Sequence, residues 1–320
     1  MPDPRALENT DIPNAAALLT NAYPHRAHES RLWKASTDRN EERRWVLDGD
    51  PGGVLAAYLG LWPVHGTKFR VDLVVHPTYR NRGLGNELLA WLIERAEALG
   101  ATSLQARPYA TEAIAMRLLD RQGFRETMRM TGLMLDDTSA VQLDSLDGLQ
   151  HRLEAQGIRI TTLARELATD RTAWTKLRDA NQAAYVGWPD PDPSPNNEPP
   201  KPESPEEFRR RAEKFGLINN ACFIAAGPTD YFGYSALTAV DAANGEAGSG
   251  GTAVRPERRD TGVATALKAC CIRWAQDNGY RRLATSSGNP AMIRVNEKFG
   301  FRRTYEEARL VLRLGSDSSR

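Results

Sequence analysis

Apolar residues recur along the chain at two spacings, one typical of helices and one typical of strands. Leu84, Leu88, Leu92 and Ala96 lie four residues apart and predict an amphipathic helix. Asp11 predicts the start of an earlier helix as its N-cap. Apolar runs predict strands at Arg43–Leu47, Val54–Leu61, Phe69–Val75, from Leu104 and at Phe124–Leu135, with a short helix at Ala113–Leu119.

The second half of the chain repeats this order of elements. Its predicted strands are Ala221–Ala226, Tyr231–Ala239, Gly250–Val254, Arg282–Thr285 and Phe301–Leu314, and its predicted helices are Val263–Asp277 and Ala291–Lys298. Residues 74–85 recur at 253–264, an offset of 179 residues, and residues 122–125 recur at 299–302, an offset of 177. Two separate matches at nearly one offset indicate a duplicated domain. We expect a first domain over 1–137, a linker over 138–157 and a second domain over 158–320.

The composition narrows the class of protein. Lysine and arginine number 42 against 41 aspartates and glutamates, and this near balance removes the simplest argument for a nucleic-acid or membrane-surface protein. Cys222, Cys270 and Cys271 cannot form a disulfide framework, and the last two are expected to be buried packing residues. The first residues lack an apolar signal-peptide core, and no apolar run could span a bilayer, so we expect a cytoplasmic protein. His25 and His28 have no further ligand pattern, so no metal is expected.

The duplicated segment has the chemistry of a phosphate-binding turn. Gly83 and Gly85 lie between a predicted strand and a predicted helix, with Arg80 and Arg82 close by. Glycine lets the backbone approach a phosphate, and a helix N-terminus offers free N–H groups and partial positive charge. The alternative is a glycine turn whose arginines face solvent. The duplication, together with the flanking strand and helix, favours phosphate binding.

This arrangement resembles the acetyl-coenzyme-A binding motif of the GNAT N-acetyltransferase superfamily. The motif falls on Arg80, Gly83 and Gly85 in the first half and on Arg259, Gly262 and Ala264 in the second. The resemblance covers almost the whole chain as two GNAT folds in tandem. It implies an α/β fold in which a mixed sheet has helices on both faces, and a splayed pair of strands that admits acetyl-CoA as the acyl donor.

The resemblance also implies which residues hold acetyl-CoA. Its pyrophosphate would lie on the backbone amides of Arg82, Gly83, Leu84 and Gly85, or of Thr261, Gly262, Val263 and Ala264. Its pantetheine arm would bond like an added strand to Val74 and Val75, or to Ala253 and Val254.

The two halves depart from the family pattern in different places. The first has the better phosphate turn, because the second places Asp260 in its turn, where a carboxylate repels pyrophosphate unless Arg258 or Arg259 neutralises it. Further along the chain, it is the second half that matches the family pattern better. Asn289 and Asn296 resemble a pair of asparagines in tandem GNAT proteins and are our candidates for contacts to CoA, whereas the first half has Glu112 and Leu119 at that offset.

Candidates for proton transfer are fewer, and neither half has the tyrosine that the family often uses as an acid. Asp72 occupies the position where the family often has a carboxylate base. In the second half that position is Gly251, and Glu246 lies upstream, where it could act through water. Tyr109 and Tyr305 are candidates for the acid. The alternative for each is a surface carboxylate or a packing tyrosine.

The segment from Trp188 to Pro205 contains many prolines and cannot form a helix or a central strand. In the family this region borders the acceptor site. Its carboxylates outnumber its one lysine, Lys201, and they are Asp190, Asp192, Glu198 and Glu203. An acidic lid that favours a cationic amine and a solvated loop are the two interpretations.

These observations predict an N-acetyltransferase that transfers an acetyl group from acetyl-CoA directly to a small-molecule primary amine, with the second half favoured as the active one. The alternatives are a non-catalytic acyl-CoA-binding sensor and an acetyltransferase of protein amines. The expected partners are acetyl-CoA and the amine, without nucleic acid or membrane. We expect either a monomer, as an internal pseudo-dimer, or a homodimer.

Overall fold

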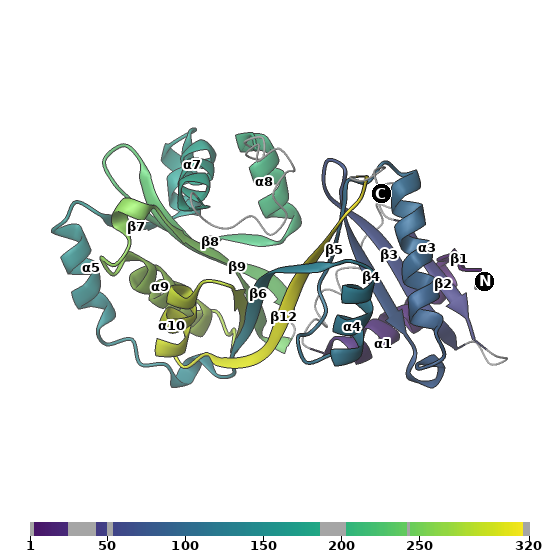
Figure 1. Cartoon of the computed structure of the whole chain (residues 1–320). Helices are drawn as coiled ribbons and strands as arrows, with labels where there is room; N and C mark the ends of the chain where they lie inside the picture. Colours follow the sequence, from purple (N-terminus) through teal and green to yellow (C-terminus); the bar gives the residue numbers. More distant parts are fainter. Residues whose placement is uncertain (1–2, 25–42, 50–53, 186–202, 242–243, 316–320) are drawn as a thin grey trace. The chain divides into compact units, whose positions relative to one another are not determined.

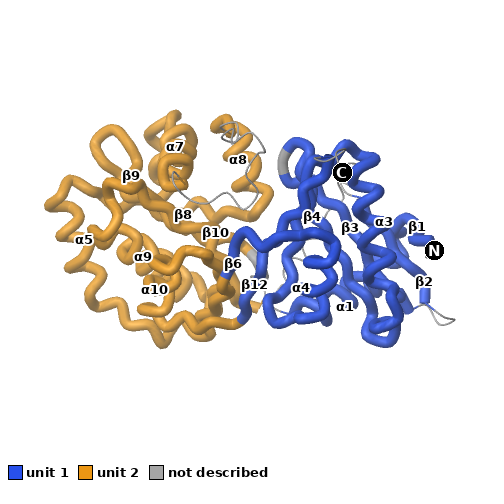
Figure 2. The backbone as a smooth tube through the Cα atoms, viewed as in Figure 1, with its two compact units in different colours: residues 1–130, 305–320 blue, residues 131–304 orange. Residues whose placement is uncertain are grey.

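The computed structural model describes residues 3–24, 43–49, 54–185, 203–241 and 244–315. The chain divides into two compact units, which are residues 1–130 with 305–320 (unit 1) and residues 131–304 (unit 2) (Figure 2). Each unit contains a mixed sheet with helices packed on it, which confirms the predicted fold class.

The sheet of unit 1 follows the order β1-β2-β3-β4-β5-β12. Its strands are β1 (Arg5–Ala6), β2 (Arg43–Asp48), β3 (Leu55–His65), β4 (Lys68–Val75), β5 (Ser103–Ala106) and β12 (Arg302–Arg313). Its helices are α1 (Ile12–Ala22), α3 (Leu84–Ala98) and α4 (Ala113–Arg121). Neighbouring strands are antiparallel except β4 and β5, which are parallel.

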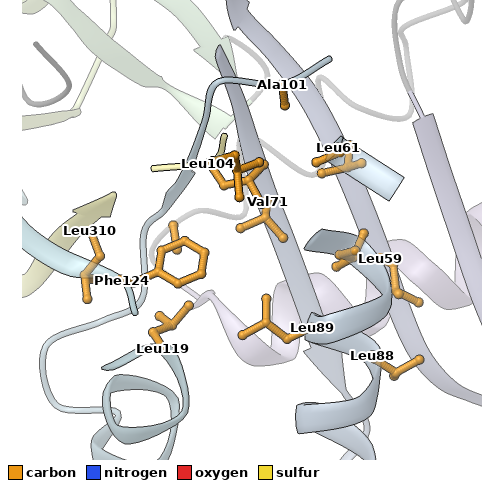
Figure 3. Packing of buried hydrophobic residues seen from close by; sticks show 14 of the residues in the cluster. Leu59, Leu61, Val71, Leu88, Leu89, Ala101, Leu104, Leu119, Phe124 and Leu310 are labelled. Atoms are coloured by element: carbon orange, nitrogen blue, oxygen red, sulfur yellow. The ribbon is translucent and has the colours of Figure 1, made fainter. Parts of the chain in front are cut away.

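Residue alternation along β3 gives unit 1 two apolar layers. Leu59 and Leu61 pack with the α3 residues Leu89 and Leu92, and Figure 3 shows Leu59, Leu61 and Leu89 in this cluster. Tyr58 packs with α1 on the opposite face of the strand. Burial of each leucine contributes about 2 kcal/mol, so the predicted leucine stripe is what fixes α3 to the sheet. Asp11 precedes α1 as predicted, but its carboxylate accepts from Arg5 and from the Glu8 amide rather than capping the helix.

The sheet of unit 2 follows the order β6-β11-β10-β9-β8-β7. Its strands are β6 (Arg125–Leu135), β7 (Arg159–Thr162), β8 (Leu217–Ala226), β9 (Tyr231–Asp241), β10 (Glu246–Val254) and β11 (Arg282–Ser287). Its helices are α5 (Leu146–Glu154), α6 (Leu163–Thr169), α7 (Ala173–Tyr185), α8 (Pro205–Lys214), α9 (Val263–Asp277) and α10 (Pro290–Lys298). Helices α7 and α8 pack on one face, and α9 and α10 on the other (Figure 1).

The last strand of each sequence half completes the sheet of the other unit. Residues 131–135 of β6 pair with residues 283–287 of β11, and residues 310–313 of β12 pair with residues 103–106 of β5. Both strands change unit along their length (Figure 2). Division by sequence repeat and division by packing therefore assign these strands differently. The residues expected as a linker contain α5, which packs on α9.

Because β6 and β12 are exchanged, a mutation at a buried position in either strand should destabilise the unit that contains the other half of the sequence. Leu310 is buried with Leu89 in unit 1, and Leu133 is buried with Leu283 in unit 2. Leu310→Ala and Leu133→Ala should each cost about 2–5 kcal/mol. In hydrogen exchange followed by mass spectrometry, Leu310→Ala should expose peptides of α3 and β4, and Leu133→Ala those of α9 and β11. Faster exchange in α9 caused by Leu310→Ala would contradict the assignment.

Candidate functional site

In each unit two parallel strands pair briefly and then part. Strands β4 and β5 pair over three residues up to Arg70 with Gln105, and β10 and β11 pair over three residues up to Gly248 with Ala284. On their other edges, β5 bonds to β12 over residues 103–106 and β11 bonds to β6 over residues 283–287. Among the described strands, one edge of β4 after Arg70 and one edge of β10 after Gly248 are left open toward the turn that follows. These openings are the splayed strand pairs that the sequence predicts.

The turn after β4 has the geometry that the glycine motif requires. Asn81 and Gly83 adopt left-handed φ angles of 62° and 85°, and α3 begins directly after Gly83. Arg80 Nε donates to the Val75 carbonyl at 2.9 Å, which ties the turn to the end of β4. Among the described residues, no protein group accepts from the N–H groups of residues 82–85. Such a row of free donors fits a pyrophosphate.

The turn after β10 repeats this geometry. Asp260 and Gly262 have φ angles of 60° and 92°, and α9 begins after Gly262. Arg259 Nε points at the Val254 carbonyl at 3.4 Å, and its Nη2 donates to the Ala184 carbonyl at the end of α7 at 2.9 Å. Across the described parts of the chain, residues 261–264 also keep free N–H groups.

Neither Arg258 nor Arg259 pairs with Asp260 in the described structure. Arg259 bonds to backbone carbonyls, and the Arg258 guanidinium lies over the Phe232 ring, 4.4 Å from its centroid. Asp260 is exposed, so water screens its charge.

The two turns differ in how open they are. A Cβ added at Gly83 would have Glu87 Oε1 as its nearest atom at 3.8 Å, whereas at Gly262 it would meet Leu149 Cδ1 at 3.0 Å. Leu149 belongs to α5, which has no counterpart among the described residues of unit 1. Helix α5 therefore covers one side of the second turn.

The asparagines predicted to contact CoA lie at both ends of α10. Asn289 Oδ1 accepts from the Ala291 amide at 2.9 Å and caps the helix. Asn296 is buried, and its Nδ2 donates to the Met292 carbonyl at 2.9 Å. Its Oδ1 is buried without a hydrogen-bond partner in the described structure. An amide N–H of a bound ligand would satisfy that oxygen.

The acid and base candidates have other partners within their own units. Asp72 lies 3.6 Å from Arg70 in unit 1, and Glu246 lies 3.5 Å from Arg282 at the closed end of the second splay. Tyr305 belongs to unit 1, where its ring centroid is 5.2 Å from that of Tyr109. The strand exchange thus places Tyr305 and Glu246 in different units.

The face of unit 2 under α7 carries a polar pair next to the opening, in which Tyr234 is buried and Asn181 is half-buried. Tyr234 Oη donates to Asn181 Oδ1 at 2.7 Å, and burial raises the pKa of the tyrosine. The same hydroxyl lies 3.8 Å from the Cβ position of Gly251 in β10. Sequence patterns missed both residues, because Tyr234 lies within an apolar strand and Asn181 is one of several polar residues of α7. Of the expected lid carboxylates, Glu203 pairs with Arg211 at 2.9 Å; Asp190, Asp192 and Glu198, like Lys201, lie outside the described residues.

Beneath the second splay, polar side chains replace apolar ones of the first. Unit 1 has the apolar residues Leu59, Val71, Leu73, Leu89 and Leu92 here. The corresponding residues of unit 2, in the same order, are Ser235, Ser249, Thr252, Lys268 and Cys271. Strand β10 also contains a bulge at Gly250, which β4 lacks at this place. A comparison of the two halves position by position would have found Lys268 in the apolar stripe.

The sequence profile of the acetyltransferase (GNAT) family matches residues 11–124 and again 174–301. The chain belongs to the acetyltransferase (GNAT) family, whose members use acetyl-CoA.

Individual relatives match parts of the chain. A mycothiol acetyltransferase of Renibacterium salmoninarum is 33% identical over 130 residues, which are 40% of this chain and 33% of the relative. An L-methionine sulfoximine/L-methionine sulfone acetyltransferase of Salmonella typhimurium is 29% identical over 36% of this chain and 77% of its own length. The chain thus covers about a third of the first of these two relatives.

A tandem GNAT protein from the clavulanic acid biosynthesis pathway shares the fold over the whole chain. The TM-score is 0.67 at 18% identity, and the match covers 98% of each chain. The tandem arrangement is therefore confirmed. In the described ranges, no helix is long and apolar enough to cross a membrane, and no cluster of histidine, cysteine and carboxylate side chains could hold a metal.

Alanine in place of Gly262 should cost more stability than alanine in place of Gly83. Both positions have left-handed φ, which costs about 1–2 kcal/mol for an alanine. At Gly262 the new Cβ also meets Leu149. In urea unfolding, Leu149→Ala should reduce the cost of Gly262→Ala and leave the cost of Gly83→Ala unchanged. Additive costs at Gly262 would show that α5 does not press on the turn.

Proposed function

We propose that the protein transfers the acetyl group of acetyl-CoA directly to a small-molecule primary amine, and that unit 2 is the active unit. The observation that carries this proposal is the second splay, which combines a turn of free N–H groups with a polar interior. Unit 1 has the turn but an apolar interior, so it would bind acetyl-CoA without supplying groups for proton transfer.

The donor would lie along the open edge of β10. Its pyrophosphate would bond to the amides of residues 261–264, and the backbone of Ala253 and Val254 would bond to its pantetheine arm. In unit 1 the corresponding contacts come from Val74, Val75 and the amides of residues 82–85. The unpaired Asn296 Oδ1 would accept from a pantetheine amide.

The proposal of a small acceptor is supported by the helices that pack on the face of β10 opposite α9. Helices α7 and α8 pack there, and the polar groups near Gly251 include the buried Tyr234 and the half-buried Asn181. A compact polar pair under two helices suits a small amine better than an extended peptide. The L-methionine sulfoximine/L-methionine sulfone acetyltransferase to which the chain is similar acts on compounds of this size.

The proposal that unit 2 is the active unit can be tested by introducing a negative charge at each of the two glycine turns. A carboxylate on the turn opposes the pyrophosphate at the helix N-terminus. Gly262→Glu should abolish turnover, measured as CoA thiol release with a panel of primary amines, whereas Gly83→Glu should leave it near the wild-type rate. Acetyl-CoA titrations of both variants report binding separately.

Matched controls separate charge from backbone strain. Gly279→Glu and Gly100→Glu place the same side chain at left-handed glycines with no atom within 4 Å of the Cβ position, at the far ends of α9 and α3. Both should keep full turnover. Loss of turnover with Gly83→Glu alone would assign the activity to unit 1. Binding of acetyl-CoA without transfer to any amine would favour a sensor, and transfer only to peptides would favour a protein substrate.

A further inference from the structure

A buried amine lies beneath the point where β10 and β11 part. Lys268, from α9, is 2% exposed, and its Nζ is 3.2 Å from Ser249 Oγ. Ser249 is half-buried, so its hydroxyl lies between solvent and the amine. In the described structure no carboxylate pairs with Lys268.

Ser249 occupies a defined place in the splay. It directly follows Gly248, the last residue of β10 that pairs with β11, and directly precedes the bulge at Gly250. The hydroxyl therefore lies at the inner end of the opening. The candidate base Glu246 lies three residues back and pairs with Arg282.

The surroundings of the amine favour its neutral form. Burial lowers the pKa of Lys268, and the groups that face it are the Ser249 hydroxyl from β10, the Cys271 thiol from α9 and the Phe301 ring, whose centroid is 6.0 Å away. Cys271 opposes the shift only weakly, because burial also raises the pKa of that thiol and keeps it protonated. A neutral lysine behind a hydroxyl is a proton acceptor.

The fold does not need this pair. Unit 1 builds the same splay with Val71 and Leu89 at these two places, both in its apolar core. A buried lysine costs free energy that a leucine does not. The polar pair therefore points to chemistry rather than to packing.

We propose that Ser249 and Lys268 take up the proton that the acceptor amine releases during acetyl transfer. The amine nitrogen bonds to the acetyl carbon while the carbon–sulfur bond breaks. The electron pair of the broken bond stays on sulfur, which becomes the CoA thiolate. The surplus proton on nitrogen passes to Ser249 Oγ as the serine's own proton passes to Lys268 Nζ. The lysine then returns one proton, through Ser249, to the CoA thiolate. This assignment rests on the proposed acetyl transfer in unit 2.

Lys268→Met tests the assignment, because methionine fills the space without a titratable group. We expect an unchanged affinity for acetyl-CoA and a kcat at pH 7 lower by about 100-fold or more, the size of a lost general base. Ser249→Ala should give a similar loss. The double variant should lose no more than either single one, because the two residues act as a unit. Leu89→Met, the matched change in unit 1, should keep the wild-type kcat.

The pH profile distinguishes proton transfer from packing. Since Lys268 must be neutral to accept a proton, wild-type kcat should fall as pH drops through the pKa of its amine. In Lys268→Met this acidic limb should disappear, and the rate should rise with pH only as the free acceptor amine loses its own proton.

A measurement of folding stability tests whether the Lys268 amine is neutral, and it does not depend on enzymatic activity. The unfolded chain binds a proton at Lys268 up to a pH of about 10.5, whereas the folded chain releases it at lower pH. Lys268→Met should therefore stabilise the protein most in acid, and the gain should shrink as pH rises toward 10.5.

The outcomes separate this assignment from the proposed function. A Lys268→Met variant with wild-type kcat and pH profile would overturn the role of Lys268 while leaving acetyl transfer intact. A loss of acetyl-CoA binding in that variant, or a stability gain independent of pH, would also overturn it. A wild-type protein that transfers acetyl to no amine would refute the proposed function itself.

Discussion

The parting of two parallel strands is the constraint on which the rest of each unit depends. A strand has two edges for hydrogen bonding, and β5 and β11 use both, one for an antiparallel neighbour and one for β4 or β10. The parallel pairing stops after three residues, and no described strand pairs with that edge of β4 or β10 beyond this point. The glycine turn and the following helix N-terminus lie at the wide end of that opening. Backbone geometry alone thus supplies the donors that a phosphate and an extended arm require.

The two units use one framework for different interiors. Unit 1 fills the space under its splay with leucine and valine, which adds to stability. Unit 2 places hydroxyls, a thiol and an amine there, and part of the stabilisation from burial is lost. The first unit shows that the framework tolerates an apolar interior. The polar interior of the second is therefore a property of its side chains and not of its fold.

Local patterns predicted the elements well because each depends on nearby residues. The leucine stripe after Leu84, the duplicated glycine turns and the short parallel strands all follow from spacing within a few residues. The partner of a terminal strand does not, since β6 and β12 have similar alternation and either could complete either sheet. That ambiguity is why the sequence does not show that Tyr305, from the second half of the chain, packs in unit 1. The ion pair of Glu246 with Arg282 and the contact of Leu149 with the second turn also depend on packing between distant segments.

The exchanged strands set an order of events during synthesis. Residues 131–304 form one continuous stretch, so every residue of unit 2 has been added to the chain before Tyr305. The first 130 residues of unit 1 are made early, but the free edge of β5 finds its neighbour only when β12 has been made. The N-terminal unit therefore acquires its last strand only after the whole of unit 2 has been synthesised. Until then it presents an unpaired strand edge to the cell, and unpaired edges are where chains associate wrongly and where chaperones bind.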